Sequence, residues 1–135
     1  MQNRNILVIE DNELNMKLMR GIFDIGKYHI IEAFDAETGI CLAREHLPFL
    51  VLMDIQLPGM DGLKATQIIK ADPELKDIPV VALTGFAMQG DEEKAIAAGC
   101  DGYITKPIAI QEVLEIINSF CNGGTPNQKQ YMVRK

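Results

Sequence analysis

Apolar runs rich in β-branched residues alternate along the chain with segments in which apolar residues recur every three or four positions. The runs predict strands buried on both faces, and the periodic segments predict helices. We predict strands at 5–9, 28–34, 49–53, 80–83 and 102–105, and helices at 13–25, 35–46, 62–71, 91–98 and 110–120. This alternation predicts an α/β fold, with a mostly parallel five-stranded sheet that carries helices on both faces.

The first helix is predicted from an apolar stripe at helical spacing. The stripe consists of Leu14, Leu18, Ile22 and Ile25, with Met19 beside it. Met16 and Met19 are interpreted as core residues rather than as a soft-metal site. Gly26 predicts the end of this helix.

Composition favours one globular domain. The 135 residues are 47% hydrophobic and 24% charged, which is average and leaves enough apolar side chains for a core. No apolar run approaches the roughly 20 residues that span a bilayer, because Asp54 ends the run at 49–53. The N-terminus lacks the features of a signal peptide, and Met1 is so close to the first strand that we expect the chain to begin there. We predict a folded domain at 1–120 and a flexible polar tail at 121–135.

Charge and cysteine content narrow the function classes. The net charge is −6, and the tail at 121–135 holds three basic residues and no acidic one, so the domain itself is more acidic still. Such a surface repels a nucleic acid backbone, which argues against direct DNA binding. The three cysteines, Cys41, Cys100 and Cys121, have no metal-ligand spacing and predict no disulfide framework. We therefore expect the reducing cytoplasm, with Cys41 and Cys100 buried as small apolar groups.

The residues that could form a functional site lie directly after the predicted strands. Glu10 and Asp11 follow the first strand, Asp54 the third, Thr84 the fourth and Lys106 the fifth. The carboxyl ends of parallel strands share one edge of the sheet, so these side chains should meet there. Two carboxylates about 4 Å apart repel by roughly 4 kcal/mol at an effective dielectric near 20, so a proton or a cation must relieve them. Hard oxygen ligands suit Mg²⁺, and a nearby lysine suits an anionic ligand such as phosphate.

Other phosphate and hydrolase sites fit less well. No P-loop motif is present, and acids stand where a dinucleotide or flavodoxin-type phosphate loop needs Gly, Ser or Thr. Gln56 occupies the place where an aspartyl phosphatase would usually have its second acid. His29 and His46 lie away from the predicted rim, so a Ser-His-Asp triad is not indicated. A Mg²⁺-dependent phosphatase or small hydrolase that uses the acidic rim remains the alternative from another class.

Four motifs, in this order and spacing, resemble the response regulator receiver domain of the CheY-like family over roughly residues 4–120. They are Ile6-Leu-Val-Ile-Glu-Asp-Asn12, Leu52-Met-Asp-Ile-Gln-Leu-Pro-Gly-Met-Asp-Gly62, Val81-Ala-Leu-Thr84 and Tyr103-Ile-Thr-Lys-Pro107. Two positions depart from the family pattern: Gly85 stands where Ala is usual, and Glu10 replaces the commoner Asp. Two segments are similar both to stand-alone regulators of the DivK type and to receiver modules of hybrid histidine kinases. They are Glu10-Asp-Asn-Glu-Leu-Asn-Met-Lys-Leu18 and Phe86-Ala-Met-Gln-Gly-Asp-Glu-Glu93.

The resemblance implies a flavodoxin-like (βα)5 fold with strand order 2-1-3-4-5, and it implies a role for each site residue. Asp54 matches the phosphoacceptor, and Lys106 and Thr84 match the groups that contact the phosphoryl group. Mg²⁺ would be held by Glu10, Asp11, Asp54 and the backbone carbonyl of Gln56. Tyr103 matches the switch aromatic that turns inward when Thr84 is drawn toward the phosphate.

The resemblance also implies the partners. A sensor histidine kinase or a histidine phosphotransfer protein would supply the phosphoryl group, and the domain would assist only its own phosphorylation and dephosphorylation. The output would be a contact with another protein through 91–98, 102–105 and 110–120, around Glu93, Tyr103 and Glu112. The motifs do not separate a stand-alone regulator from a module cut from a longer kinase or regulator. We also expect a cis Lys106-Pro107 peptide that aims Lys106 back at Asp54.

Overall fold

The computed structural model describes residues 4–57, 59–85 and 91–121, so the predicted tail beyond Cys121 lies outside the described residues. All ten predicted elements are present. They are β1 (Asn5–Ile9), α1 (Glu13–Gly26), β2 (His29–Ala33), α2 (Ala36–His46), β3 (Leu50–Asp54), α3 (Gly62–Ala71), β4 (Val80–Thr84), α4 (Asp91–Ala98), β5 (Gly102–Thr105) and α5 (Ile110–Cys121). Three side chains cap helices by accepting a backbone N–H three residues on: Asn12, Asp35 and Asp61.

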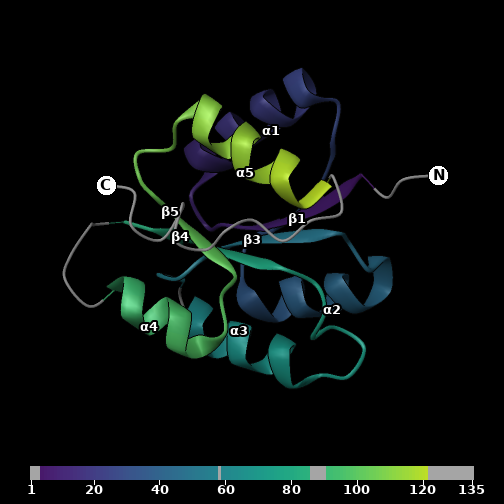
Figure 1. Cartoon of the computed structure of the whole chain (residues 1–135), viewed down its shortest axis with the longest axis vertical. Helices are drawn as coiled ribbons and strands as arrows, with labels where there is room; N and C mark the ends of the chain where they lie inside the picture. The colour runs from purple at the N-terminus through teal and green to yellow at the C-terminus, as the bar shows by residue number, and fades with distance from the viewer. Residues whose placement is uncertain (1–3, 58, 86–90, 122–135) are drawn as a thin grey trace.

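The five strands form one parallel sheet in the order β2-β1-β3-β4-β5. Figure 1 shows α1 and α5 on one face of this sheet, and α2, α3 and α4 on the other. This is the predicted flavodoxin-like arrangement. The order reverses between β1 and β3, and the carboxyl ends of these two strands are where such a fold places its ligand site.

Successive strand residues point to opposite faces, so the sheet divides the core into two layers. Ile6 and Val8 of β1 pack in the layer covered by α1 and α5. Leu7 and Ile9 pack in the layer covered by α2, α3 and α4. Both layers are closed to solvent, which explains why the strands are continuous apolar runs rather than alternating ones.

Of the apolar stripe in α1, Ile22 and Met19 are buried, whereas the other members are exposed. Leu14 is 77% exposed and Ile25 is 63% exposed, and Leu18 is exposed as well. The buried residues of this helix are Met16, Met19, Ile22 and Phe23. The helix carries apolar residues on two faces, and the face with Met16 and Phe23 fits the layer beneath α1 and α5. The prediction that Met16 and Met19 lie in the core is confirmed.

Several boundaries also differ from the prediction. β3 extends through Asp54 because Asp54 pairs with Leu83 of β4. Helix α1 continues through Gly26 and ends at Lys27, whose left-handed backbone (φ 64°) forms the C-cap. A Cβ at Gly26 would lie 2.8 Å from the Tyr28 ring and 2.9 Å from Leu114, so this glycine serves close packing.

Cys100 is buried as expected, whereas Cys41 of α2 is exposed, contrary to prediction.

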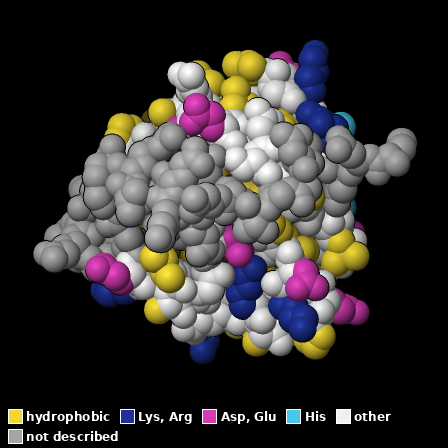
Figure 2. All heavy atoms as spheres, viewed as in Figure 1, with side chains coloured by type: hydrophobic (Ala, Val, Ile, Leu, Met, Phe, Trp, Pro, Cys, Tyr) yellow, Lys and Arg dark blue, Asp and Glu magenta, His cyan; other side chains and the backbone are white. Residues whose placement is uncertain are grey.

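The Lys106-Pro107 peptide is cis, as predicted. Within the described part of the chain, no helix is long and apolar enough to cross a membrane. Figure 2 shows one face of the molecule, on which the coloured Lys and Arg side chains stand apart or beside acidic ones rather than in one basic patch.

Candidate functional site

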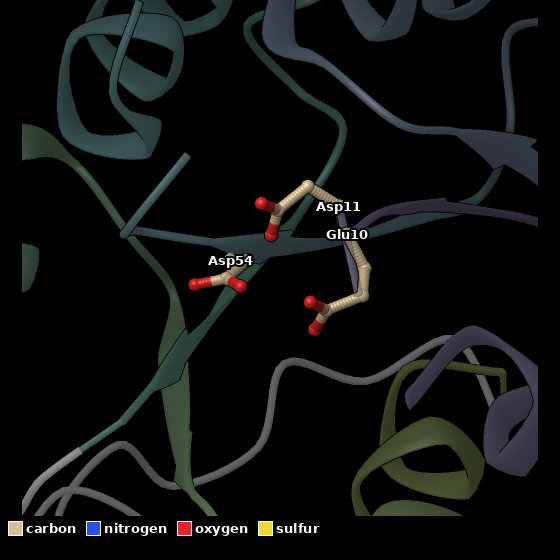
Figure 3. A group of neighbouring side chains, drawn as sticks. All are labelled: Glu10, Asp11 and Asp54. Atoms are coloured by element: carbon tan, nitrogen blue, oxygen red, sulfur yellow. The ribbon is translucent and has the colours of Figure 1, made fainter. Parts of the chain in front are cut away.

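The strand register brings the predicted site residues to one edge of the sheet. Ile9 of β1 pairs with Met53 of β3, so the acids that follow Ile9 stand next to Asp54. One oxygen from each of Glu10, Asp11 and Asp54 lies within 4.8 Å of the others. Figure 3 shows the three carboxyl groups gathered beside the ends of β1 and β3. The acidic cluster predicted from the sequence is therefore present.

Helix α3 begins very close to the backbone of Asp54. A Cβ at Gly62, the first residue of α3, would lie 2.3 Å from the Asp54 carbonyl oxygen and 2.6 Å from Ile55 Cα. Only glycine lets α3 begin this close to the end of β3. Sequence reasoning assigned no role to Gly62, although a glycine directly after the N-cap Asp61 is a signal that could have indicated a close approach.

Lys106 connects the two buried acids of the site. Its Nζ lies 2.9 Å from Asp54 Oδ2 and 3.1 Å from Glu10 Oε1. Glu10 is fully buried, and Asp54 is 2% exposed. Burial lowers the pKa of Lys106, but the hydrogen bond to Asp54 and the charges of Asp54 and Glu10 outweigh it, so the pKa is raised. The ammonium therefore stays charged and faces the predicted nucleophile.

Glu10 is the fully buried member of the cluster. Its Oε2 accepts the Asn12 N–H at 3.1 Å. Its Oε1 lies within ion-pair distance of Lys106 but receives no well-formed hydrogen bond, alone among the buried side-chain N and O atoms of the described residues. Burial and the neighbouring Asp54 raise the pKa of Glu10 above its ordinary value, against the opposing charge of Lys106.

The site residues fit a hard divalent cation. Three carboxylates share the edge, one of them has an unsatisfied buried oxygen, and Asp11 is exposed and reaches solvent. Among the residues that the structure describes, the ion pairs of this cluster involve one cation, Lys106, beside the three acids. Mg²⁺ takes oxygen ligands, keeps several waters and is held by one or two carboxylates, which suits a cluster that is half open to solvent.

The other predicted residues surround Asp54. The N–H of Gln56 donates to Asp54 Oδ1 at 2.9 Å. Thr84 ends the neighbouring strand and is buried, and its carbonyl accepts the Lys106 N–H at 2.7 Å. Tyr103 is 3% exposed and packs in the layer of α2, α3 and α4. Tyr103 is thus a buried residue of this layer.

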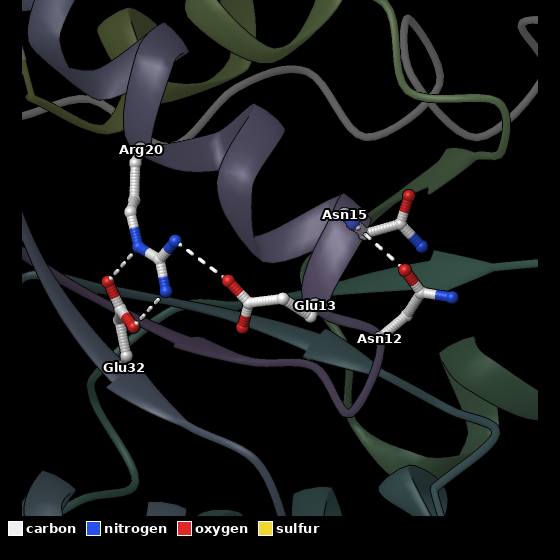
Figure 4. A network of polar contacts seen from close by, with 5 residues as sticks. All are labelled: Asn12, Glu13, Asn15, Arg20 and Glu32. Atoms are coloured by element: carbon white, nitrogen blue, oxygen red, sulfur yellow. Dashed lines mark hydrogen bonds and ion pairs between the residues drawn. The ribbon is translucent and has the colours of Figure 1, made fainter.

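An ion-pair network fixes α1 beside the site. Arg20 donates to both oxygens of Glu32 on β2, at 2.6 and 2.8 Å, and to Glu13 in the first turn of α1 at 3.0 Å. Figure 4 shows this network next to the capping contact from the Asn15 N–H to Asn12. The hydrogen bonds with Glu32 and Glu13 raise the pKa of the Arg20 guanidinium. The network ties the helix that follows Asp11 to the sheet.

Relatives of known sequence resemble the chain over most of its length. Residues 6–118 match the response regulator receiver domain family. The polar-differentiation response regulator DivK of Brucella anthropi is 47% identical over 117 residues, which are 87% of this chain and 95% of the relative. DivK of Brucella abortus (strain 2308) is equally similar over the same shares.

Solved structures show the same fold. The receiver domain of sensor histidine kinase PA1611 from Pseudomonas aeruginosa, with a magnesium ion in its active-site cleft, is 30% identical with a TM-score of 0.83 and covers 89% of this chain and 98% of that one. The receiver domain of Saccharomyces cerevisiae Ssk1, crystallised with the histidine phosphotransfer protein Ypd1, is 24% identical with a TM-score of 0.84 and covers 93% of each chain. At that identity the likeness concerns the fold alone. The chain belongs to the response regulator receiver domain family.

Proposed function

We propose that Asp54 is the residue that accepts the phosphoryl group in this two-component receiver. The contact that carries the proposal is Lys106 Nζ at 2.9 Å from Asp54 Oδ2, inside a cluster of three acids. Asp54 differs from Glu10 because the exposed residue Gln56 follows it two positions on, and it differs from Asp11 because Lys106 lies beside it. A sensor histidine kinase or a histidine phosphotransfer protein is the proposed donor.

The proposed reaction needs little from the protein except positioning and charge. An Asp54 oxygen attacks the phosphorus of the donor phosphohistidine, and the imidazole nitrogen leaves with the electrons of the P–N bond. Lys106 pairs with the negative charge of the transferred group, and the Thr84 hydroxyl can donate to it. Asp11, Asp54 and the Gln56 carbonyl, with Glu10 beside them, would hold Mg²⁺, which supplies charge neutralisation at the phosphoryl oxygens.

The exposed apolar residues of α1 support a docking surface for the donor. A donor that brings its histidine to Asp54 must cover the edge of the sheet where α1 begins. Leu14 and Leu18, in the first turns of α1, are exposed there. Apolar side chains exposed next to a polar site mark a surface that a partner covers.

The output surface is proposed to be formed by α4, β5 and α5. Glu93 of α4 is exposed, Glu112 of α5 is half-buried, and Tyr103 of β5 is buried between the sheet and its helices. Phosphorylation would draw Thr84 toward the phosphoryl group and favour the inward position of Tyr103. The connection at 84–89, which would move, lies mostly outside the described residues.

Two further expectations belong to this proposal. The domain would act only on its own phosphoryl group, in contrast to a phosphatase or hydrolase that turns over added phosphoesters. The proposed compartment is the cytoplasm, where the exposed thiol of Cys41 would stay reduced.

Intact-mass measurement with acetyl phosphate tests the proposal. With Mg²⁺, the protein should gain one phosphoryl group, and without Mg²⁺ it should gain almost none. Asp54→Asn keeps the shape and removes the nucleophile, so the gain should disappear. Full phosphorylation of Asp54→Asn, mapped to another residue, would disprove the assignment. Sustained turnover of added phosphoesters would instead favour the hydrolase.

A further inference from the structure

The exposed side of α1 carries a seam of four positions that runs along most of the helix. Three of them are the exposed apolar residues Leu14, Leu18 and Ile25. The fourth is Gly21, where an added Cβ would meet nothing within 4 Å. The spacing of four, three and four residues is that of the contact line in a two-stranded coiled coil. The buried face of α1 consists of other residues, so packing within the domain does not explain this seam.

Two exposed charges of opposite sign flank the seam. Lys17 directly precedes Leu18, and Asp24 directly precedes Ile25. The two charges are seven residues apart, about two helical turns, so they stand on the same side of the seam. Among the residues that the structure describes, neither side chain takes part in an ion pair. Both charges are therefore available to a partner.

A second copy of the same helix complements the seam when the two helices run antiparallel. In a twofold arrangement about the middle of the seam, Leu14 of one copy faces Ile25 of the other, and Leu18 faces Gly21. The missing side chain at Gly21 leaves room for Leu18. A parallel pairing would instead set Gly21 against Gly21 and leave a gap in the contact. The order of large and small residues thus favours the antiparallel pairing.

We propose that two copies of this chain associate through α1 in this antiparallel arrangement. Lys17 of each copy then lies opposite Asp24 of the other, so the symmetry forms the same ion pair twice. The contact area is small and the charges are exposed, so the association is weak and depends on protein concentration.

The second copy accounts for the whole seam. A phosphodonor protein needs only the end of α1 beside the acidic cluster, where Leu14 lies. Ile25 lies about 16 Å further along the helix, at a rise of 1.5 Å per residue. The pairing does not depend on the proposed function. Where both hold, the second copy and the phosphodonor protein compete for Leu14 and Leu18.

Sedimentation velocity at several protein concentrations measures the association. The unchanged protein should be monomeric near about 10 µM and increasingly dimeric toward about 1 mM. Lys17→Asp sets acid against acid at both contacts, and Asp24→Lys sets lysine against lysine, so each should weaken association at least about fivefold. The double variant, which exchanges the two charges, should associate like the unchanged protein. Lys64→Asp, at an exposed lysine on α3, is the matched control and should leave the association unchanged.

A mixture of the two single variants tests the direction of the helices. Antiparallel pairing of Lys17→Asp with Asp24→Lys restores opposite charges at both contacts, so the mixture should dimerise at lower concentration than either variant alone. Ile25→Ser should also weaken association at least about fivefold, because it removes apolar contact at both ends of the seam.

Two results would overturn the pairing. One is a protein that stays monomeric up to about 1 mM, and the other is equal association of the unchanged protein and Lys17→Asp. A mixture that associates no better than its components would overturn the antiparallel arrangement. Labelling of Asp54 by acetyl phosphate does not use this face of α1, so its failure would overturn the proposed function and leave the pairing untouched.

Discussion

Lys106 Nζ lies 2.9 Å from Asp54 Oδ2, although Asp54 ends β3 and Lys106 follows β5, with β4 between them. The same ammonium lies 3.1 Å from Glu10 Oε1, at the end of β1. One cation therefore compensates two buried carboxylates from two different strands. It also stands where a phosphoryl group on Asp54 would need a positive charge, so the site is organised before any phosphoryl group arrives.

Removal of this cation should destabilise the metal-free protein. Lys106→Met leaves Glu10 and Asp54 buried without their positive partner, which should cost about 2–3 kcal/mol, since Lys106 itself is partly exposed. Urea unfolding at pH 7 in the presence of EDTA measures the loss. Lys64→Met, an exposed lysine on α3, should change the unfolding free energy by less than about 0.5 kcal/mol. Equal unfolding curves for the two variants would contradict the compensating role.

The raised pKa of Glu10 predicts a pH dependence of stability. Burial, and then the charge of Asp54, raises this pKa above the ordinary value of 4.5. The contribution of Glu10 to stability is thus fully present below pH 4.5 and is lost as the pH rises through the raised pKa. Glu10→Gln cannot ionise, so in EDTA its stability advantage over the unchanged protein should grow as the pH rises above 4.5. Urea midpoints that differ by a constant amount across this range would show that Glu10 ionises normally.

Loss of the Asp11 side chain should weaken Mg²⁺ binding without lowering the free energy of unfolding. Its side chain is exposed, and its removal relieves repulsion within the cluster. Asp11→Ala should bind Mg²⁺ at least about tenfold more weakly by calorimetry, with an unfolding free energy in EDTA that is unchanged or higher. Asp77→Ala, an exposed acid in the connection before β4, is the matched control. Equal Mg²⁺ affinity of the two variants would remove Asp11 from the proposed ligands.

The order of elements could be predicted from the sequence because continuous β-branched runs and helical spacing are distinct signals. The core face of α1 could not, since Leu14 and Leu18 have the same helical spacing as Met16, Met19 and Phe23. Only the shape of the layer beneath the helix decides between the two faces. In the site, the strand ends indicated which residues meet. The burial of Glu10 depends on a side-chain path that no spacing reveals.

Two helical glycines should respond to alanine in opposite ways. A Cβ added at Gly21 of α1 would point into open space, so Gly21→Ala should stabilise the protein by about 0.5–1 kcal/mol through helix propensity. A Cβ at Gly39 of α2 would lie 2.3 Å from Ile9 Cδ1, so Gly39→Ala should cost about 1–3 kcal/mol. Urea unfolding compares both with the unchanged protein. A shift of the same sign in both variants would contradict the packing described for these helices.

Thr84→Ala should weaken the output without preventing phosphorylation. A switch between mostly inactive and mostly active states takes about 5.5 kcal/mol, and one charge-assisted hydrogen bond supplies roughly 1.5–3 kcal/mol. Lys106 must therefore contribute too, and loss of the Thr84 hydroxyl should reduce the response rather than abolish it. Amide chemical shifts with and without beryllofluoride, a phosphoryl mimic, measure this at α4 and β5. Shifts confined to residues that touch Asp54, even in the unchanged protein, would contradict the proposed output.

The strand order determines which parts of the chain must fold before the site is complete. The acids come from the ends of β1 and β3 and the ammonium from the segment after β5, which is the last strand of the described residues and an edge of the sheet. A nascent chain that stops before β5 holds the carboxylates without their cation, and a fragment that starts after β1 holds the cation without Glu10 and Asp11. Neither piece holds the complete set of site residues. Signalling competence is therefore a property of the finished sheet, so a truncated or half-folded copy should be silent rather than wrongly active.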